Sequence, residues 1–155
     1  MIQFKPSQRL LLTLVMLASA ALTVPQLGQR SLWWDEAFSW WFTTVKLGDL
    51  WQIAWNHEEF NMVLYQALLN VWSRWGDSEF WLRLPSALFV MGTVWAVAKL
   101  GRILFEPRVG LTAALLIALN GFVVLYGQET RAYSMLALAN LVKWGRPLTG
   151  QLRPA

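Results

Sequence analysis

The chain has 155 residues, of which 56% are hydrophobic and only 14% are charged. This surplus of apolar surface needs lipid to cover it and excludes an ordinary soluble domain, and the absence of cysteine excludes disulfides and thiol catalysis. The formal charge of +4 does not indicate a nucleic-acid-binding protein, because the Lys and Arg residues are spread singly and flank apolar runs.

The first predicted element is a membrane-spanning helix over residues 10–28, which contain no charged side chain. Lys5 and Arg9 precede it, which predicts a cytoplasmic N-terminus and an outer location for the loop that follows. A cleaved signal peptide is the alternative, because residues 18–20 are small and follow a short apolar core. The apolar stretch continues to Val24, which favours an uncleaved helix, and both interpretations export the next segment.

Residues 29–80 have the composition of a membrane–water interface. Nine of the eleven Trp residues lie between Trp33 and Trp81, together with most of the carboxylates. Trp is most stable where hydrocarbon meets water, because its apolar ring system carries one N–H donor. Amphipathic helices lying flat on the membrane are therefore predicted at 37–56 and 60–75.

Two further spans are predicted at 81–102 and 109–128. A span at 60–75 is the alternative, but it would put Lys99 and Arg102 outside, against the positive-inside rule. The stretch 109–128 has twenty uncharged residues, enough at ~1.5 Å per residue to cross ~30 Å of hydrocarbon. This third span returns the chain to the outer side.

A fourth span is predicted to start at Ala132 and to remain unfinished, because only eleven uncharged residues precede Lys143. Residues 1–142 are interpreted as one transmembrane domain and 143–155 as a polar tail left by truncation or a frame shift. A short helix packed in a larger assembly is the alternative. The predicted fold class is an all-α integral membrane protein with three to four transmembrane helices and interfacial helices in its first outer loop.

The first candidate site is the carboxylate pair Asp35 and Glu36 in the Trp-rich run 31–41. Adjacent carboxylates point apart on a helix, so one can face a cavity while the other takes a structural partner. Desolvation by Trp rings raises a carboxylate pKa, which suits a general base. Helix capping is the alternative, because Ser31 precedes the pair and a first turn favours negative charge.

The second candidate site is a metal site at His57 and Glu58, followed by a further carboxylate at Glu59. Imidazole and carboxylate groups are ligands for a divalent metal ion. A solvated turn is the alternative, because metal sites usually gather ligands from several segments.

The third candidate site follows the third span, at the depth of the first loop, and consists of Gln128, Glu129, Arg131 and Tyr133. The planar guanidinium of Arg131 can bind phosphate through two oxygens. In the alternative, Glu129 and Arg131 neutralise each other at the membrane boundary.

A helix-start signal, Asp77 and Ser78, precedes the second span, and Pro85 falls in its first turns. This motif is interpreted as structural and not as catalytic. Arg83 lies at the depth of lipid phosphates, so it is predicted to contact an anionic headgroup.

Taken in order, three of these segments resemble the N-terminal part of the GT-C membrane glycosyltransferases, which include protein O-mannosyltransferases and the lipid A aminoarabinose transferase. They are the Asp35-Glu36 pair after the first span, the stretch 61–89, and the run 128–133, which is similar to the motif Q-E-x-R-x-Y. The resemblance covers residues 10–139.

The resemblance implies a multi-pass enzyme of the inner or plasma membrane. Such an enzyme transfers a sugar from a polyprenyl-phosphate-linked donor to an acceptor at the outer face, with inversion of the anomeric carbon. Asp35 would be the base, Glu36 would stabilise the loop or orient Asp35, and Arg131 would stabilise the leaving phosphate. The other substrate-binding residues would be Gln128, Glu129 and Tyr133.

The chain also departs from the family. Many members have His-Pro-Pro where this chain has His57-Glu58-Glu59, and members are several times longer, so this chain is expected to be inactive alone. The expected partners are a lipid-linked sugar donor and membrane lipids, with a divalent metal ion as the one candidate cofactor. The alternative function is a small non-catalytic membrane protein that docks a partner through its Trp-rich loop.

Overall fold

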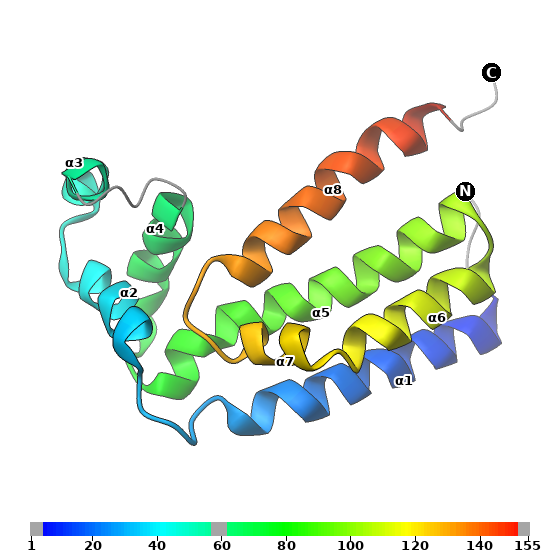
Figure 1. Cartoon of the computed structure of the whole chain (residues 1–155), viewed down its shortest axis with the longest axis horizontal. Helices are drawn as coiled ribbons and strands as arrows, with labels where there is room; N and C mark the ends of the chain where they lie inside the picture. Colours follow the sequence, from blue (N-terminus) through cyan, green and yellow to red (C-terminus); the bar gives the residue numbers. More distant parts are fainter. Residues whose placement is uncertain (1–4, 57–61, 152–155) are drawn as a thin grey trace.

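The computed structural model describes residues 5–56 and 62–151 (Figure 1). This part of the chain is helical and contains no strand, which confirms the all-α class. Its α-helices are α1 (Pro6–Thr23), α2 (Trp34–Thr44), α3 (Leu50–Asn56), α4 (Val63–Trp72), α5 (Glu79–Leu104), α6 (Pro107–Ala118), α7 (Gly121–Gly127) and α8 (Tyr133–Gln151). Short 3-10 turns occur at Val24–Gln26, Leu47–Asp49 and Ser73–Trp75.

Two helical stretches in the described residues are long and apolar enough to cross a membrane. One is Pro6–Gln26, which joins α1 to the following 3-10 turn, and the other is α5. The pair α6 and α7 meets the same criterion together and adds a third span if the pair counts as one. The described residues therefore build a membrane protein whose candidate spans lie where the sequence predicts them.

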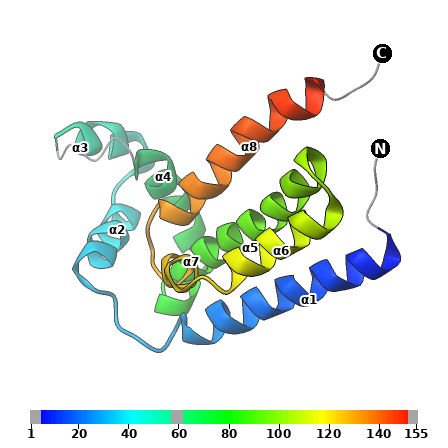
Figure 2. The ribbon, with the colours of Figure 1, turned by 45° about the vertical axis from the view of Figure 1, so that its right-hand side comes forward.

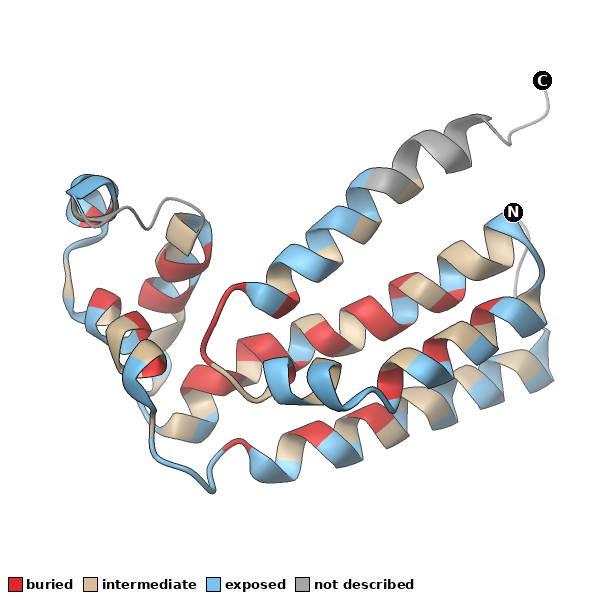
Figure 3. Ribbon diagram, in the orientation of Figure 1, coloured by how far each residue is buried: buried red, intermediate tan, exposed pale blue. Residues whose placement is uncertain are grey.

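The long helices form a bundle with all the loop helices at one end. Helices α1, α5 and α6 lie side by side and α8 packs along α5, whereas α2, α3 and α4 gather at the end opposite the two termini (Figures 1 and 2). Small residues fill the contact between the long helices, with Ala98, Ala114 and Ala118 buried (Figure 3). The outward-facing leucines of α1, such as Leu10 and Leu14, are exposed on the side of the helix that lipid would cover.

Two glycines let α5 and α6 pack closely. A Cβ on Gly101 would lie 2.6 Å from the Cα of Gly110, a separation that real Cβ atoms do not adopt. A Cβ on Gly110 would overlap the backbone carbonyl of Ala98. The close packing of α5 against α6 therefore depends on glycine, which has no side chain, at both positions.

Near the start of α5, a tryptophan side chain supplies the hydrogen bond that a proline cannot make. Ser78 caps the helix by accepting a hydrogen bond from the N–H of Trp81 at 3.3 Å. Pro85 has no N–H, so the carbonyl of Trp81, four residues earlier, loses its usual helical donor. The indole N–H of Trp72 donates to that carbonyl at 2.9 Å, and the indole of Trp81 donates to the Trp72 carbonyl at 3.2 Å. The two rings stack at 4.7 Å and join α4 to α5.

The predicted third span is not one straight helix. Helix α6 ends at Ala118, α7 begins at Gly121, and their axes differ by 65°. The side-chain oxygen of Asn120 accepts hydrogen bonds from the N–H groups of Phe122 and Val123, at 3.0 and 3.2 Å, and so caps α7. The span predicted over 109–128 is therefore divided into two helices, because the Asn-Gly pair at 120–121 starts a new helix within the uncharged stretch.

The first loop contains the expected short helices with different bounds. The predicted helix 37–56 is divided into α2 and α3, and the predicted helix 60–75 is α4 followed by the turn Ser73–Trp75. The side-chain nitrogen of Asn70 holds α4 to the end of α2 through the carbonyls of Phe42 and Val45, at 2.9 and 2.8 Å. Several Trp rings of this region remain exposed, namely Trp33, Trp34, Trp51, Trp55 and Trp75.

Helix α8 is longer than the expected unfinished span. It runs from Tyr133 to Gln151, so residues 143–151, expected as part of a polar tail, continue the helix. Leu138 packs against Gly92 of α5, where a Cβ would lie 2.8 Å from its methyl group. α8 is not among the candidate membrane spans in the described residues.

Candidate functional site

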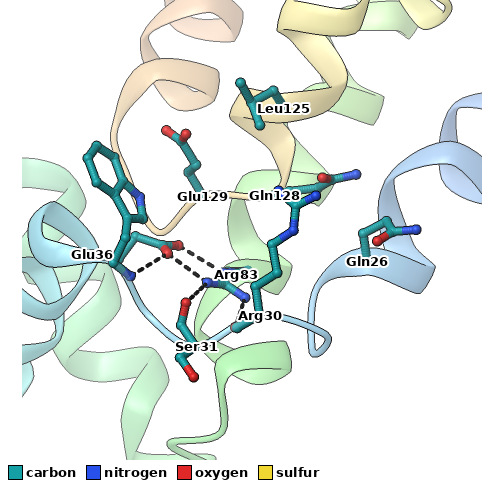
Figure 4. Close-up of a pocket in the computed structure, with 9 residues that line it drawn as sticks. Gln26, Arg30, Ser31, Glu36, Arg83, Leu125, Gln128 and Glu129 are labelled. Atoms are coloured by element: carbon teal, nitrogen blue, oxygen red, sulfur yellow. Dashed lines mark hydrogen bonds and ion pairs between the residues drawn. The ribbon is translucent and has the colours of Figure 1, made fainter.

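Glu36 and Arg83 form a buried ion pair where the first loop meets the bundle (Figure 4). Arg83 Nε donates to Glu36 Oε1 at 2.8 Å and Nη2 donates to Oε2 at 2.7 Å, with side chains only 4% and 1% exposed. The backbone N–H of Thr130 adds a third bond to Oε1 at 2.7 Å, and that of Trp33 adds a fourth to Oε2 at 3.4 Å. The last bond is a helix cap, so the capping alternative holds for Glu36.

Arg83 uses its other N–H groups on the loop that follows α1. Its Nη1 donates to the carbonyls of Leu27 and Arg30 at 2.8 and 2.7 Å, and Nη2 donates to the carbonyl of Ser31 at 3.1 Å. Every guanidinium N–H therefore has a protein partner. The predicted contact with a lipid headgroup was wrong because these groups enclose the side chain, although the structural interpretation of the segment is confirmed.

Asp35 is the more accessible member of the carboxylate pair. It lies in the first turn of α2, and its side chain is 39% exposed, against 1% for Glu36. Asp35 Oδ2 lies 3.7 Å from Arg131 Nη2, and Arg131 Nη1 donates to the Asp35 carbonyl at 3.3 Å. Glu36 is thus the member that takes a structural partner, as expected, whereas the expected cavity-facing member is not found: Asp35 is exposed but does not line the cavity described below, which Glu36 borders.

Arg131 is largely buried, and its backbone is held by a hydrogen bond from α5. Its side chain is 7% exposed, and its backbone carbonyl accepts a hydrogen bond from Ser86 Oγ at 3.3 Å. Ser86 in turn is bonded to the hydroxyl of Tyr65 at 2.9 Å, so α4, α5 and the segment before α8 are linked in series. Because Ser86 gives its proton to the Arg131 carbonyl, the Tyr65 hydroxyl is the donor to Ser86, and burial raises the pKa of Tyr65 above its ordinary value. The alternative in which Glu129 and Arg131 neutralise each other finds no ion pair between these two side chains, and Arg131 lies beside Asp35 instead.

A cavity of about 330 Å³ lies beside the ion pair (Figure 4). It opens between the loop after α1, the start of α2 and the end of α7. Its lining combines two cations, two carboxylates, two amides and an aromatic ring with Ser31 and Leu125: Gln26, Arg30, Ser31, Trp33, Glu36, Arg83, Leu125, Gln128 and Glu129. This volume is at the lower end of that of small-molecule sites, and the mixed polar lining suits a polar ligand.

Glu129 faces this cavity with its carboxylate (Figure 4). Within residues 5–56 and 62–151, its carboxylate has no hydrogen bond or ion pair. Loss of solvent on burial, followed by the negative charge of Glu36, raises the pKa of Glu129, while the positive charge of Arg131 opposes the rise. A carboxylate of this kind retains its oxygens for a ligand.

The other two predicted substrate-binding residues lie on either side of this segment. The side-chain nitrogen of Gln128 donates to the carbonyl of Leu22 at 3.1 Å and so fixes the end of α7 to the end of α1. Tyr133 begins α8, and its ring lies 5.0 Å from that of Tyr126 and 5.8 Å from the guanidinium carbon of Arg131. Gln128 therefore borders the cavity, whereas Tyr133 supports Arg131 from the other side.

The predicted metal pair His57 and Glu58 lies outside the described residues. Among the residues that the structure describes, no group of three or more His, Asp or Glu side chains is arranged to hold a metal ion.

Three features of the site depend on the tertiary structure and were not predicted from the sequence. Arg83 was assigned to lipid, Arg30 was not singled out, and Tyr65 with Ser86 was passed over. One available signal was the position of Arg83 inside an apolar span, since a charge at that depth usually finds a protein partner. For Arg30, Tyr65 and Ser86 the sequence pattern contains no such signal.

Comparison with protein families matches residues 57–143 to dolichyl-phosphate-mannose-protein mannosyltransferase, over more than half of the chain. Comparisons with curated proteins and with solved structures find no match. The matched stretch contains α4 to most of α8, and with it Arg83, Glu129 and Arg131. Together with the apolar helices, this match confirms the resemblance to GT-C enzymes and identifies a mannosyltransferase-type glycosyltransferase. The chain belongs to the dolichyl-phosphate-mannose-protein mannosyltransferase family.

Proposed function

We propose that the protein transfers a sugar from a polyprenyl-phosphate-linked donor to an acceptor hydroxyl at the outer face of the membrane. Asp35 is the general base of this proposal, and the anomeric carbon is inverted. The observation that carries it is the approach of Asp35 and Arg131 to 3.7 Å, although 96 residues separate them along the chain.

Charge distribution supports the outer location of this pair. Helix α1 begins, α5 ends and α6 begins at the same end of the bundle (Figure 1). The cations Lys5, Arg9, Lys99, Arg102 and Arg108 lie at or near these helix ends. By the positive-inside rule this end faces the cytoplasm of a plasma or inner membrane, so the opposite end, with Asp35, faces outward.

In the proposed reaction, the acceptor oxygen attacks the anomeric carbon and its proton passes to the Asp35 carboxylate. The bond between the anomeric carbon and the phosphate oxygen breaks, and its electron pair remains on the phosphate. Attack opposite the leaving group inverts the carbon. Base assistance of this kind contributes roughly 10²- to 10⁴-fold to the rate.

The burial of Glu36 supports the choice of Asp35. Four N–H donors surround the Glu36 carboxylate, which leaves it no free position for an acceptor proton. Asp35 keeps part of its side chain exposed and has one cation beside it. Glu36 then acts as a positioning residue, because it ties the first turn of α2 to α5 and to Thr130.

Arg131 contributes in this proposal through its positive charge. It places a positive charge beside Asp35 and adds positive potential on the side where the leaving phosphate gains charge. Gln128 and Glu129, which line the cavity, and Tyr133, whose ring lies beside Arg131, are the proposed substrate-contacting groups. His57 and Glu58 remain a predicted metal pair, and no step of the reaction is assigned to a metal ion.

Replacement of the base tests the proposal. The protein is expressed from its native gene in membranes, supplied with polyprenyl-phosphate mannose, and assayed for mannosyl transfer and for the anomeric configuration of the product. Asp35→Asn is expected to lower kcat by roughly 10²- to 10⁴-fold, while the matched control Asp77→Asn, an exposed carboxylate ahead of α5, keeps native turnover. Turnover of Asp35→Asn equal to that of the native protein would reject Asp35 as the base.

A further inference from the structure

A second cavity lies between α5 and α8, toward the end of the bundle opposite α2 (Figures 1 and 2). Its volume is about 200 Å³, and its mostly apolar walls include Leu100 and Ile103 of α5 and Leu141 and Val142 of α8. This volume is below that of ordinary small-molecule sites, and apolar walls suit a hydrocarbon chain better than a polar solute. The cavity shares no lining residue with the one beside Glu36.

Gly145 keeps this second cavity open. A Cβ at Gly145 would lie 3.9 Å from the nearest methyl group of Leu100, which is an ordinary van der Waals distance. Helix packing therefore does not require glycine at this position, in contrast to Gly101 and Gly110, where a Cβ would overlap backbone atoms. The glycine leaves a hollow between the two helices that a larger side chain at position 145 would fill.

Among the described residues that line this hollow, Lys99 alone is charged. Its ammonium nitrogen lies 4.8 Å from the centre of the exposed Trp95 ring. A cation–π contact of this kind leaves ammonium N–H groups for an anion. Neither α5 after Glu79 nor α8 contains an acidic residue, so the two helices that form the walls supply no counter-charge.

The depth of Lys99 along α5 suits contact with a lipid phosphate. Helix α5 ends at Leu104, which places Lys99 roughly 7.5 Å before the helix end at ~1.5 Å per residue. The positive-inside rule puts this end of α5 on the cytoplasmic side, where the leaflet carries anionic lipids. Lys and Trp side chains both reach the headgroup level. The charge of Lys99 therefore meets phosphates, while the apolar walls of the cavity lie toward the hydrocarbon.

We propose that the hollow between α5 and α8 binds one anionic phospholipid of the cytoplasmic leaflet. The Lys99 ammonium contacts the phosphate, and the upper part of one acyl chain lies between the helices beside Gly145. Charge selects the lipid, because phosphatidylcholine carries its own cation next to the phosphate and phosphatidylglycerol does not. The proposal shares the orientation of the bundle with the proposed function, but neither Asp35 nor Arg131 contributes to it.

A lipid-binding measurement tests this assignment without any assay of transfer. The full-length protein in detergent micelles is titrated with phosphatidylglycerol or with phosphatidylcholine, and the bound lipid is counted by native mass spectrometry. The unchanged protein is expected to retain one phosphatidylglycerol in preference to phosphatidylcholine. Lys99→Gln is expected to weaken phosphatidylglycerol binding by roughly tenfold to a hundredfold, because it removes a charge-assisted contact, whereas Lys99→Arg keeps the charge and the binding.

Two further variants separate the hollow from the general charge of this surface. Gly145→Leu fills the space next to Leu100 and leaves every charge in place, so it is expected to lose the bound lipid as well. The matched control is Arg108→Gln, which removes an exposed cation at the same end of the bundle but outside the lining and keeps native affinity. Because Lys99 is exposed, its replacement leaves the core intact and decides the test alone if Gly145→Leu does not fold.

Any of four outcomes overturns the lipid site. The first is equal binding of the two lipids by the unchanged protein, and the second is an affinity of Lys99→Gln within twofold of the native value. The third is an equal loss in Arg108→Gln, which would make the contact a general effect of surface charge. The fourth is native binding by folded Gly145→Leu, which would place the lipid outside the hollow. None of these outcomes bears on Asp35 as the base, because transfer is tested by a separate variant.

Discussion

Arg83 binds both oxygens of the Glu36 carboxylate, at 2.8 and 2.7 Å, across 47 residues of chain. The two side chains are almost completely buried, and each has all its hydrogen-bonding groups occupied by the other or by backbone. A pair of this kind orders three segments at once: the loop after α1, the start of α5 and the segment before α8. Asp35 precedes Glu36 in the chain, so the buried pair also fixes the backbone position of Asp35.

Glu36→Gln is expected to destabilise the protein by about 3–5 kcal/mol, because it leaves the Arg83 guanidinium buried without its counter-charge. The measurement is the free energy of unfolding in detergent micelles. The matched control is Glu106→Gln, which removes an exposed carboxylate at the other end of the bundle. A loss no larger than that of the control would contradict the structural role of the pair.

Trp72→Phe is expected to destabilise the protein by about 1–3 kcal/mol, because the carbonyl of Trp81 then has no donor. Adding Pro85→Ala to this variant should recover stability, since Ala at 85 brings back the N–H that bonds the carbonyl four residues earlier. A double-mutant cycle of unfolding free energies measures this coupling.

The control for this cycle is Trp75→Phe, which changes a largely exposed indole in the same loop. Strict additivity of Trp72→Phe and Pro85→Ala would show that the indole does not compensate the proline.

Glu129→Gln is expected to change the pH dependence of stability. The folded protein raises the pKa of Glu129 through burial, so it holds the proton more tightly than the unfolded chain does. By linkage, this contribution favours the native protein fully below the ordinary value of 4.5 and is lost as the pH rises through the higher folded pKa. The variant should therefore gain stability relative to the native protein from about pH 4.5 upward.

Thermal unfolding between acidic and neutral pH measures this difference, with Glu106→Gln as the reference for removing one carboxylate. A stability difference between Glu129→Gln and the native protein that does not vary with pH would exclude the expected pKa shift.

The sequence alone predicted the helices that lie in lipid. Uncharged stretches flanked by cations predict α1 and α5, because the thickness of hydrocarbon sets their length. The same counting failed at Asn120, where one capping side chain bends the third span. Local chemistry at a single residue therefore overrode the apolar composition of the stretch.

The sequence predicted which residues belong to the candidate site, but not the role of each residue. Adjacency alone indicated that Asp35 and Glu36 point apart, and only the position of Arg83 decides which of the two is buried. Arg131 was expected to face a phosphate, but its nearest acid is Asp35, which precedes it by 96 residues. Contacts over such separations depend on helix packing, which sequence periodicity does not describe.

The hydrogen bonds to Glu36 come from segments that are synthesised after α2. Its partners arise from Arg83 and from the backbone of Thr130, so a nascent chain that has delivered only α1 and α2 to the membrane lacks both. Asp35 can reach its final position only after α5, α6 and α7 have been inserted. A chain that ends before Thr130 lacks the backbone N–H that bonds Glu36 Oε1, so the carboxylate has its full set of partners only once the later helices are present.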